Sequence, residues 1–245
     1  MNNQDPEEQI STLPPRTVQL QTRLAASFAI LAVMSAMVVT LVLVITVRNQ
    51  LLADVQARVR DAVAIGALQI DGDMHATLVD ADQQEGEVYA QLKIKLQNIR
   101  NAGANYRFVY TLRYNAGDNL MYFIVDAETE PEDFSPLMSA YTDLPAETTA
   151  VLSNLREPFV EPEFYTDQWG EWLTGYAPIY TSDNRLDAVL AMDVDASLVR
   201  AQTNRVIWIA LGVLVLLIPL VVTAGWQAAI DAQGSIVLSR SEEAQ

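Results

Sequence analysis

Two long apolar runs without a charged side chain stand out along the chain. The first covers residues 24–47 and the second residues 206–226. A hydrocarbon core of about 30 Å needs roughly 20 helical residues, so each run is long enough to cross a membrane. Trp208 and Trp226 lie near the two ends of the second run, as expected of rings that prefer the membrane–water boundary. The pattern predicts two transmembrane helices.

The alternative for the first run is a cleaved signal peptide. Signal peptides have an apolar region of about 7–15 residues, whereas this run is longer and follows the polar residues 1–23. An uncleaved anchor therefore fits better. Long segments between membrane helices translocate largely regardless of their charge. We expect a two-pass protein of the inner membrane, with residues 48–205 outside the cytoplasm and the tails, residues 1–23 and 227–245, inside it.

Between the two runs the apolar period changes from helical to strand-like. Apolar positions at helical spacing continue through residues 52–62, which predicts a stalk that ends at the turn of Asp71, Gly72 and Asp73. A second helical stripe covers residues 88–99 and ends at Gly103. Alternation then predicts two hairpins, whose strands are residues 106–114, 120–126, 172–181 and 186–194.

The remaining segments complete one domain. Residues 127–168 are rich in Pro, Glu, Asp and Thr and predict an irregular lid with short helical patches such as 146–155. Residues 196–204 predict a helix that leads into the second apolar run. Antiparallel strands with helices grouped on one face make an α+β fold. Since both ends of the domain continue into membrane helices, a change inside it can move one membrane helix against the other. From this stalk architecture we also expect a homodimer.

The charge balance limits the partners. The chain has 31 acidic and 15 basic residues, a net charge of −16, and residues 48–205 alone contain 25 acidic and 12 basic residues. Such a surface repels nucleic acid and anionic lipid headgroups, so we expect no nucleic-acid partner. The excess of acid favours a cationic or zwitterionic ligand. There is no cysteine, so no disulfide holds the domain.

Sequence signatures of catalysis are missing. The chain has no Gly-rich phosphate loop, nucleophile elbow or HExxH motif, and its single histidine is His75. His75 has Asp71 and Asp73 beside it but not the further ligands of a zinc site, so we expect it to form a hydrogen bond that fixes the helix turn. The acidic lid residues lack the spacing of a calcium loop and are expected to be solvated. We predict no enzyme, no metal and no cofactor.

Five segments, in this order, resemble the single Cache domain, the PAS-like, PDC-type extracytoplasmic sensor of bacterial membrane receptors. They are residues 72–75, 107–112, 122–126, 165–179 and 191–194. The resemblance covers roughly residues 48–200. It implies a central antiparallel sheet with the long helix on one face, and on the other face a ligand pocket closed by the lid. Such domains often precede nucleotide cyclases, diguanylate cyclases and histidine kinases.

Several strand and lid residues are candidates for ligand binding. Asp126 and Asp193 end or interrupt apolar strands, where a carboxylate is costly unless it is paired. The resemblance implies that such residues hold the amine of a small ligand, and the alternative is a cap or turn hydrogen bond. Tyr110 and Tyr122 can offer a ring and a hydroxyl to a ligand, or pack in the core.

Two further aromatic positions belong to the candidate site. Tyr141 lies in the lid and could act as a gate. Trp169 and Trp172 flank Gly170 and Glu171 and can form either a pocket wall or a structural corner, with the corner favoured. The predicted ligand-binding set is Tyr110, Tyr122, Asp126, Tyr141, Trp172 and Asp193.

We therefore predict a receptor that binds an amino acid, amine or small carboxylate outside the cytoplasm and shifts its membrane helices. Only about 20 residues follow the second apolar run, with no output module. The output would then be a separate cytoplasmic protein. The alternatives are an accessory or scaffold membrane subunit that binds a partner protein, and the N-terminal fragment of a longer cyclase or kinase receptor.

Overall fold

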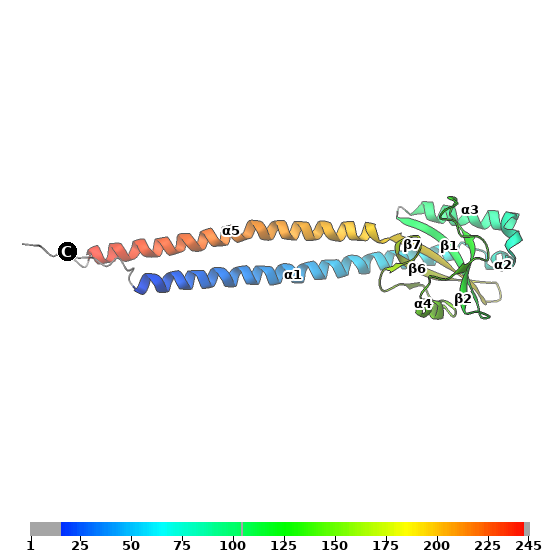
Figure 1. Cartoon of the computed structure of the whole chain (residues 1–245), viewed down its shortest axis with the longest axis horizontal. Coiled ribbons are helices and arrows are strands. Elements are labelled where there is room, and N and C mark those ends of the chain that lie inside the picture. The colour runs from blue at the N-terminus through cyan, green and yellow to red at the C-terminus, as the bar shows by residue number, and fades with distance from the viewer. Residues whose placement is uncertain (1–15, 104, 243–245) are drawn as a thin grey trace, which may run out of the picture. The chain divides into compact units, whose positions relative to one another are not determined.

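The computed structural model describes residues 16–103 and 105–242, and these divide into two compact units. One unit is residues 48–205, and the other is formed by the described residues on either side of it. Two long helices belong to both units. They are α1 (Arg16–Ala67) and α5 (Ala196–Glu242), labelled in Figure 1.

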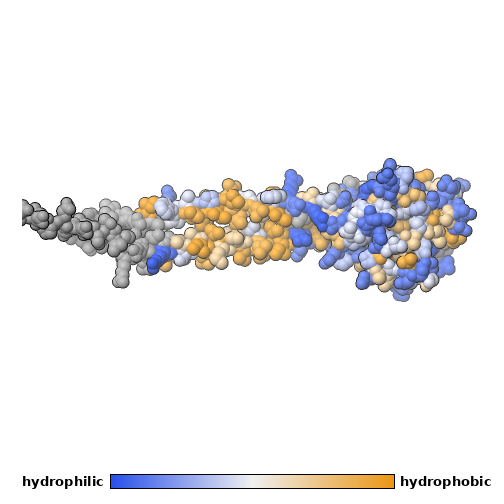
Figure 2. All heavy atoms as spheres, in the orientation of Figure 1, coloured by the Kyte–Doolittle hydropathy of each residue, from blue (hydrophilic) through white to orange (hydrophobic). Residues whose placement is uncertain are grey.

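The described residues of the unit outside residues 48–205 belong to α1 and α5, and each helix carries a long apolar stretch there. Two segments are long and apolar enough to cross a membrane, Ala26–Ala67 in α1 and Asn204–Gln227 in α5, and their most apolar windows have no buried residue. Hydrophobic residues gather along these segments in Figure 2. A continuous apolar surface of this extent marks contact with a membrane or another protein.

Residues 48–205 contain a seven-stranded antiparallel sheet. The strand order is β3-β2-β1-β7-β6-β4, and β5 also pairs with β6. The long strands are β1 (Tyr106–Asn115), β2 (Leu120–Asp126), β6 (Glu171–Tyr180) and β7 (Leu186–Asp195). The short strands are β3 (Ala140–Tyr141), β4 (Phe159–Val160) and β5 (Tyr165–Thr166). This arrangement confirms the predicted α+β, PAS-like fold with a long N-terminal helix.

Alternation along the strands gives the sheet two different faces. Val109 of β1 and Leu190 of β7 pack in one cluster with Val63 of α1 and Leu96 of α3 (Glu87–Ala102). Tyr110 and the residues that share its face pack instead in a second, aromatic cluster. Successive side chains of a strand point to opposite faces, so the helices cover one face and leave the other to the lid. The remaining helices are α2 (Gly72–Ala76), η1 (Ala81–Glu85) and α4 (Ala146–Leu152).

The predicted strands and the helix at 88–99 are present, with bounds that differ by one or a few residues. The stalk was predicted to end at Asp71, but α1 ends at Ala67. Asp71 instead caps the next helix, since its carboxylate accepts a hydrogen bond from the Met74 N–H at 3.0 Å. The lid was expected to contain only irregular chain and helical patches. It contains three two-residue strands, too short to leave an alternating pattern in the sequence.

Candidate functional site

A narrow cavity lies on the aromatic face of the sheet. Five rings line it, those of Phe108, Tyr110, Phe123, Tyr141 and Trp169. The other lining residues are Ser135 and four carboxylates, those of Asp126, Asp133, Asp167 and Asp193. The cavity volume is about 20 Å³, close to the space needed for one water molecule. Ligand pockets usually measure 300–1,000 Å³, so the lid would have to move before an organic molecule could bind here.

Asp193 is the most deeply buried charged group of the cavity. It lies near the end of β7 and is 2% exposed. Its Oδ1 accepts a hydrogen bond from the Thr174 hydroxyl at 2.5 Å and a long one from the Tyr110 hydroxyl at 3.4 Å. Burial, with a smaller contribution from the nearby carboxylate of Asp167, raises the pKa of Asp193 to about 8, against the effect of the Thr174 hydrogen bond. A cation in the cavity would therefore stabilise the ionised carboxylate.

Asp126 ends β2 and joins the cavity to the lid. Its two oxygens accept hydrogen bonds from the backbone N–H groups of Glu128 at 2.9 Å and Ser135 at 2.8 Å. Burial raises the pKa of Asp126 to about 6, while the two backbone hydrogen bonds act in the opposite direction. The carboxylate thus fixes the start of the lid, as in the turn hydrogen bond considered from the sequence, and it also faces the cavity.

Asp167 organises the loop that places Trp169 at the cavity. Its Oδ1 accepts hydrogen bonds from the backbone N–H groups of Trp169 (2.9 Å) and Gly170 (3.1 Å) and from Trp172 Nε1 (2.8 Å). Its Oδ2 accepts one from the Tyr141 hydroxyl at 2.7 Å. Gly170 has φ 155°, and a Cβ there would lie 2.5 Å from the Trp172 ring. The loop therefore needs both the carboxylate and the glycine.

Replacing Asp167 with alanine should lower the free energy of unfolding by about 2 kcal/mol, because it leaves the Tyr141 hydroxyl and the Trp172 indole N–H without their acceptor. Chemical denaturation of the full chain measures the change. Glu163→Ala removes an exposed carboxylate of the same loop and should change stability by less than about 0.5 kcal/mol. Equal effects of the two substitutions would show that Asp167 does not hold the loop.

The structure brings four of the six candidate residues to the cavity, namely Tyr110, Asp126, Tyr141 and Asp193. Trp172 lies behind it, with its ring 5.1 Å from that of Phe108 and its N–H on Asp167. Tyr122 is not at the cavity, because its hydroxyl donates to Asp118 in the hairpin turn at 2.5 Å. We therefore leave Tyr122 out of the proposed site.

Trp169, considered from the sequence as a pocket wall or a structural corner, also lines the cavity. The lining residues that were not singled out as ligand contacts are Phe108, Phe123, Asp133, Ser135 and Asp167. The signal for Asp167 was an Asp two residues before Trp169 and three before a glycine, a spacing that suits a side chain accepting from its own following backbone. Trp169 was favoured as a structural corner, but it is Trp172 that has the structural position and Trp169 that lines the cavity.

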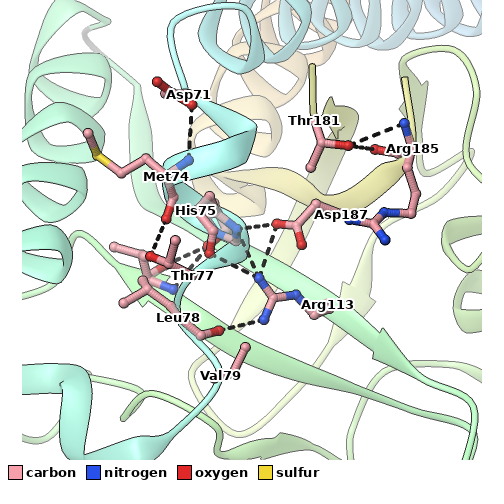
Figure 3. Close-up of polar contacts among 12 residues, drawn as sticks. Asp71, Met74, His75, Thr77, Leu78, Val79, Arg113, Thr181, Arg185 and Asp187 are labelled. Carbon is pink, nitrogen blue, oxygen red and sulfur yellow. Dashed lines mark hydrogen bonds and ion pairs between the residues drawn. The ribbon is translucent and has the colours of Figure 1, made fainter. Parts of the chain in front are cut away.

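A second polar cluster surrounds His75 in α2 (Figure 3). His75 Nδ1 lies 2.6 Å from Asp187 Oδ2, and its Nε2 lies 2.8 Å from Thr111 Oγ1. Arg113 donates to Asp187 at 3.1 Å and to the Leu78 carbonyl at 2.6 Å. The hydrogen bonding expected of His75 is present, and its partners Thr111 and Asp187 are on β1 and β7.

The chain of contacts from Asp187 through His75 to Thr111 has the order of groups in a catalytic triad. The surroundings differ from those of an active site. His75 and Thr111 are both 0% exposed, so no substrate can reach the threonine hydroxyl. Thr111 Oγ1 also accepts the Val125 N–H at 3.0 Å. The cluster ties α2 to the sheet.

No protein-family model matches the chain, and no curated protein sequence matches it. Among solved structures, the ligand-binding domain of the Campylobacter jejuni chemoreceptor Tlp3 in complex with L-valine is 15% identical, with a TM-score of 0.45. The match covers 72% of this chain, which spans 66% of the length of that domain. The periplasmic sensory domain of the C. jejuni chemoreceptor Tlp1 is 10% identical, with a TM-score of 0.34 and coverages of 64% and 60%. The periplasmic domain of RsbU from Chlamydia trachomatis is 10% identical, with a TM-score of 0.31 and coverages of 65% and 58%.

Proposed function

We propose that the chain is a membrane-anchored sensor that binds a small molecule in the cavity on the aromatic face of its extracytoplasmic domain. The observation that carries the proposal is Asp193, a carboxylate 98% buried beside a cavity and without a cationic partner among the described residues. Because a buried charge without a partner is costly, Asp193 keeps its proton, and its pKa is raised to about 8 by burial. A site of this kind is better explained by a ligand than by packing, because the ligand can supply the missing interaction.

The lining supports a small ligand rather than a protein partner. Ligand pockets combine mostly apolar and aromatic walls with a few placed polar groups, and this cavity does so. A partner-binding accessory subunit has no need of buried carboxylates on the inner face of its sheet. The Tlp3 domain has been solved with L-valine and with isoleucine, and we take amino acids, amines and small carboxylates as the classes to test here.

The anchoring is supported by the two apolar segments of α1 and α5, whose most apolar windows contain no buried residue. Each has the length that a bilayer requires. With both tails in the cytoplasm, residues 48–205 face the opposite side of the inner membrane. The acidic character of these residues, 25 acidic against 12 basic, keeps them away from anionic headgroups.

Transmission of ligand binding to the membrane helices is supported by the continuity of the chain at both ends of the domain. Asp193 is on β7, and α5 begins at Ala196 directly after that strand. The other boundary lies within α1, whose Val63 packs in the core of the domain. A ligand that binds one arrangement of the domain more tightly shifts the population toward it, and both helices then follow, in a homodimer or toward a separate output protein.

The proposal is tested with the full chain in lipid nanodiscs, titrated with amino acids, aliphatic amines and small carboxylates. Binding should change the emission of Trp169, and a ligand at 100 times its dissociation constant should add about 2.7 kcal/mol of stability. Trp208→Phe removes an exposed indole of α5 that does not line the cavity, and should leave both the change in emission and the rise in thermal midpoint. A folded protein that responds to no member of the panel would contradict the proposal and favour the partner-binding subunit.

A further inference from the structure

We propose that the cavity selects a small organic ammonium ion without a carboxylate, a primary amine rather than an amino acid. This inference rests on the proposed function, because it names the ligand class of the same site. It comes from the charges that line the cavity and from which of them already have partners.

The lining has one sign of charge. Four carboxylates contribute to it, and among the described residues that line the cavity none is lysine, arginine or histidine. An anionic group placed here would face carboxylates, with no cationic side chain among the described lining residues to balance it. Like charges in a low-dielectric site repel strongly, whereas an ammonium group is attracted.

Two of the four carboxylates already have partners that satisfy them. Asp133 pairs with Arg107 at 2.6 Å, and the guanidinium of Arg107 stacks on Phe108 with Cζ 4.4 Å from the ring centroid. Asp167 accepts four hydrogen bonds, three on Oδ1 and one on Oδ2. Neither carboxylate has need of a further cation.

The other two carboxylates, those of Asp126 and Asp193, accept fewer hydrogen bonds than Asp167 does. Asp126 has one backbone N–H on each oxygen. Asp193 receives two hydroxyl groups on Oδ1, while its Oδ2 accepts no hydrogen bond from any residue that the structure describes. Burial raises the pKa of Asp193 to about 8, as expected of a carboxylate that lacks a counter-charge. An ammonium ion donating to Oδ2 would supply both the charge and the missing donor.

The rings provide the rest of a cation site. Phe123 lies 5.2 Å from Tyr110 and 6.0 Å from Trp169, and Tyr141 lies 6.0 Å from Trp169, between ring centroids. Aromatic rings grouped in this way attract a cation through their negative faces and accept short alkyl groups. A primary amine with a short alkyl chain matches carboxylate and rings together.

The carboxylate of an amino acid has no equivalent partner. The guanidinium of Arg107, which pairs with the lining residue Asp133 at 2.6 Å, also binds Glu128 at 2.8 Å. Lys93, on α3, donates to the Glu128 carbonyl at 2.5 Å and stacks on Phe134. The backbone N–H of Ser135 is used by Asp126. The ammonium group of an amino acid would contribute favourably to the binding free energy, whereas its carboxylate would lose its hydration without gaining a partner.

The test compares matched molecules by calorimetry on the full chain in nanodiscs. Isobutylamine is valine without its carboxylate, and 3-methylbutanoate is valine without its ammonium group; putrescine and ornithine form a second pair. At least one amine should bind about tenfold or more tightly than its parent amino acid, and the acid should not bind. Asp193→Asn should weaken amine binding by about 30-fold or more, the order expected when one member of a buried charge pair is removed. Asp143→Asn, which removes an exposed lid carboxylate outside the cavity, should leave it unchanged.

The outcomes separate the two proposals. An amino acid or acid that binds as tightly as its matched amine, and competes for the same site, would overturn the ammonium selection and leave a small-molecule sensor. Amine binding that Asp193→Asn and Asp143→Asn weaken equally would also overturn it, since the effect would then be one of overall charge. A folded protein that binds none of the five molecules would overturn the selection; whether the sensor proposal falls too is decided by the wider panel.

Discussion

Replacing His75 with alanine is expected to lower the free energy of unfolding by about 3–5 kcal/mol. The substitution empties the space of a fully buried ring and removes two hydrogen bonds, to Asp187 at 2.6 Å and to Thr111 at 2.8 Å. Arg113 and Asp187 remain paired at 3.1 Å, but their contact with α2 through the ring is lost. Denaturation of the full chain in nanodiscs, followed by tryptophan emission, measures the change.

A nearby surface substitution provides the control. Val79→Ala, 65% exposed in the segment after α2, should change stability by less than about 0.5 kcal/mol. A loss below about 1 kcal/mol for His75→Ala would show that the cluster does not hold α2 on the sheet.

The same cluster predicts a direction for the pH dependence of stability. Burial lowers the pKa of His75 below its usual value, against the effect of Asp187, so the unfolded chain takes up a proton at a pH where the folded chain does not. Stability from this group is therefore complete above about pH 6.5 and is lost as the pH falls below it. His75→Gln, which cannot titrate, should lose this part of the pH dependence.

Much of the fold could be predicted because its signals are local. The uncharged runs and the alternation along β1, β2, β6 and β7 are each properties of adjacent residues, and the long elements follow from them. The end of α1 was misplaced because Asp71 suits either the stop of one helix or the cap of the next, and its hydrogen bond to Met74 decides the matter. The two-residue strands of the lid depend on pairing with β2 and β6, which no local pattern contains.

The site could be predicted only in part, for the same reason. Asp126 and Asp193 were found because a carboxylate inside an apolar strand is unusual in itself. The partners of His75, in contrast, are 112 and 36 residues away along the chain, so nothing near it in the sequence points to them. Tyr110 and Tyr122 could not be distinguished from the sequence, but the sheet places them in different surroundings. Tyr110 lines the cavity, whereas Tyr122 donates to Asp118 in the hairpin turn. Which face a strand residue takes depends on register, including the irregularity between Thr111 and Leu112.

Amine binding should weaken by about 50-fold when the pH falls from 8 to 6. The pKa of Asp193 is raised to about 8 by burial, with the Asp167 and Asp126 carboxylates adding to the rise and the hydroxyls of Thr174 and Tyr110 opposing it. An aliphatic amine stays protonated throughout, as lysine does with a pKa of about 10.4. Below the pKa of Asp193, each pH unit reduces its ionised fraction, and with it the affinity for a cation, by about tenfold.

Calorimetry in buffers of different ionisation enthalpy measures the proton exchange that goes with binding. Binding of isobutylamine at pH 6 should release close to one proton, and at pH 9 almost none, because Asp193 is then already ionised. Asp193→Asn should abolish both the proton release and the steep pH dependence of binding.

Without ligand, the Asp193→Asn variant should be more stable than the parent protein at pH 8. A carboxyl whose pKa is raised in the folded state stabilises the fold at low pH and loses that contribution as the pH rises toward 8. An affinity that stays constant between pH 6 and 8 would show that Asp193 is not the partner of the ammonium group. A pH dependence confined to about pH 6 and below would instead identify Asp126 as that partner, because its pKa is raised only to about 6.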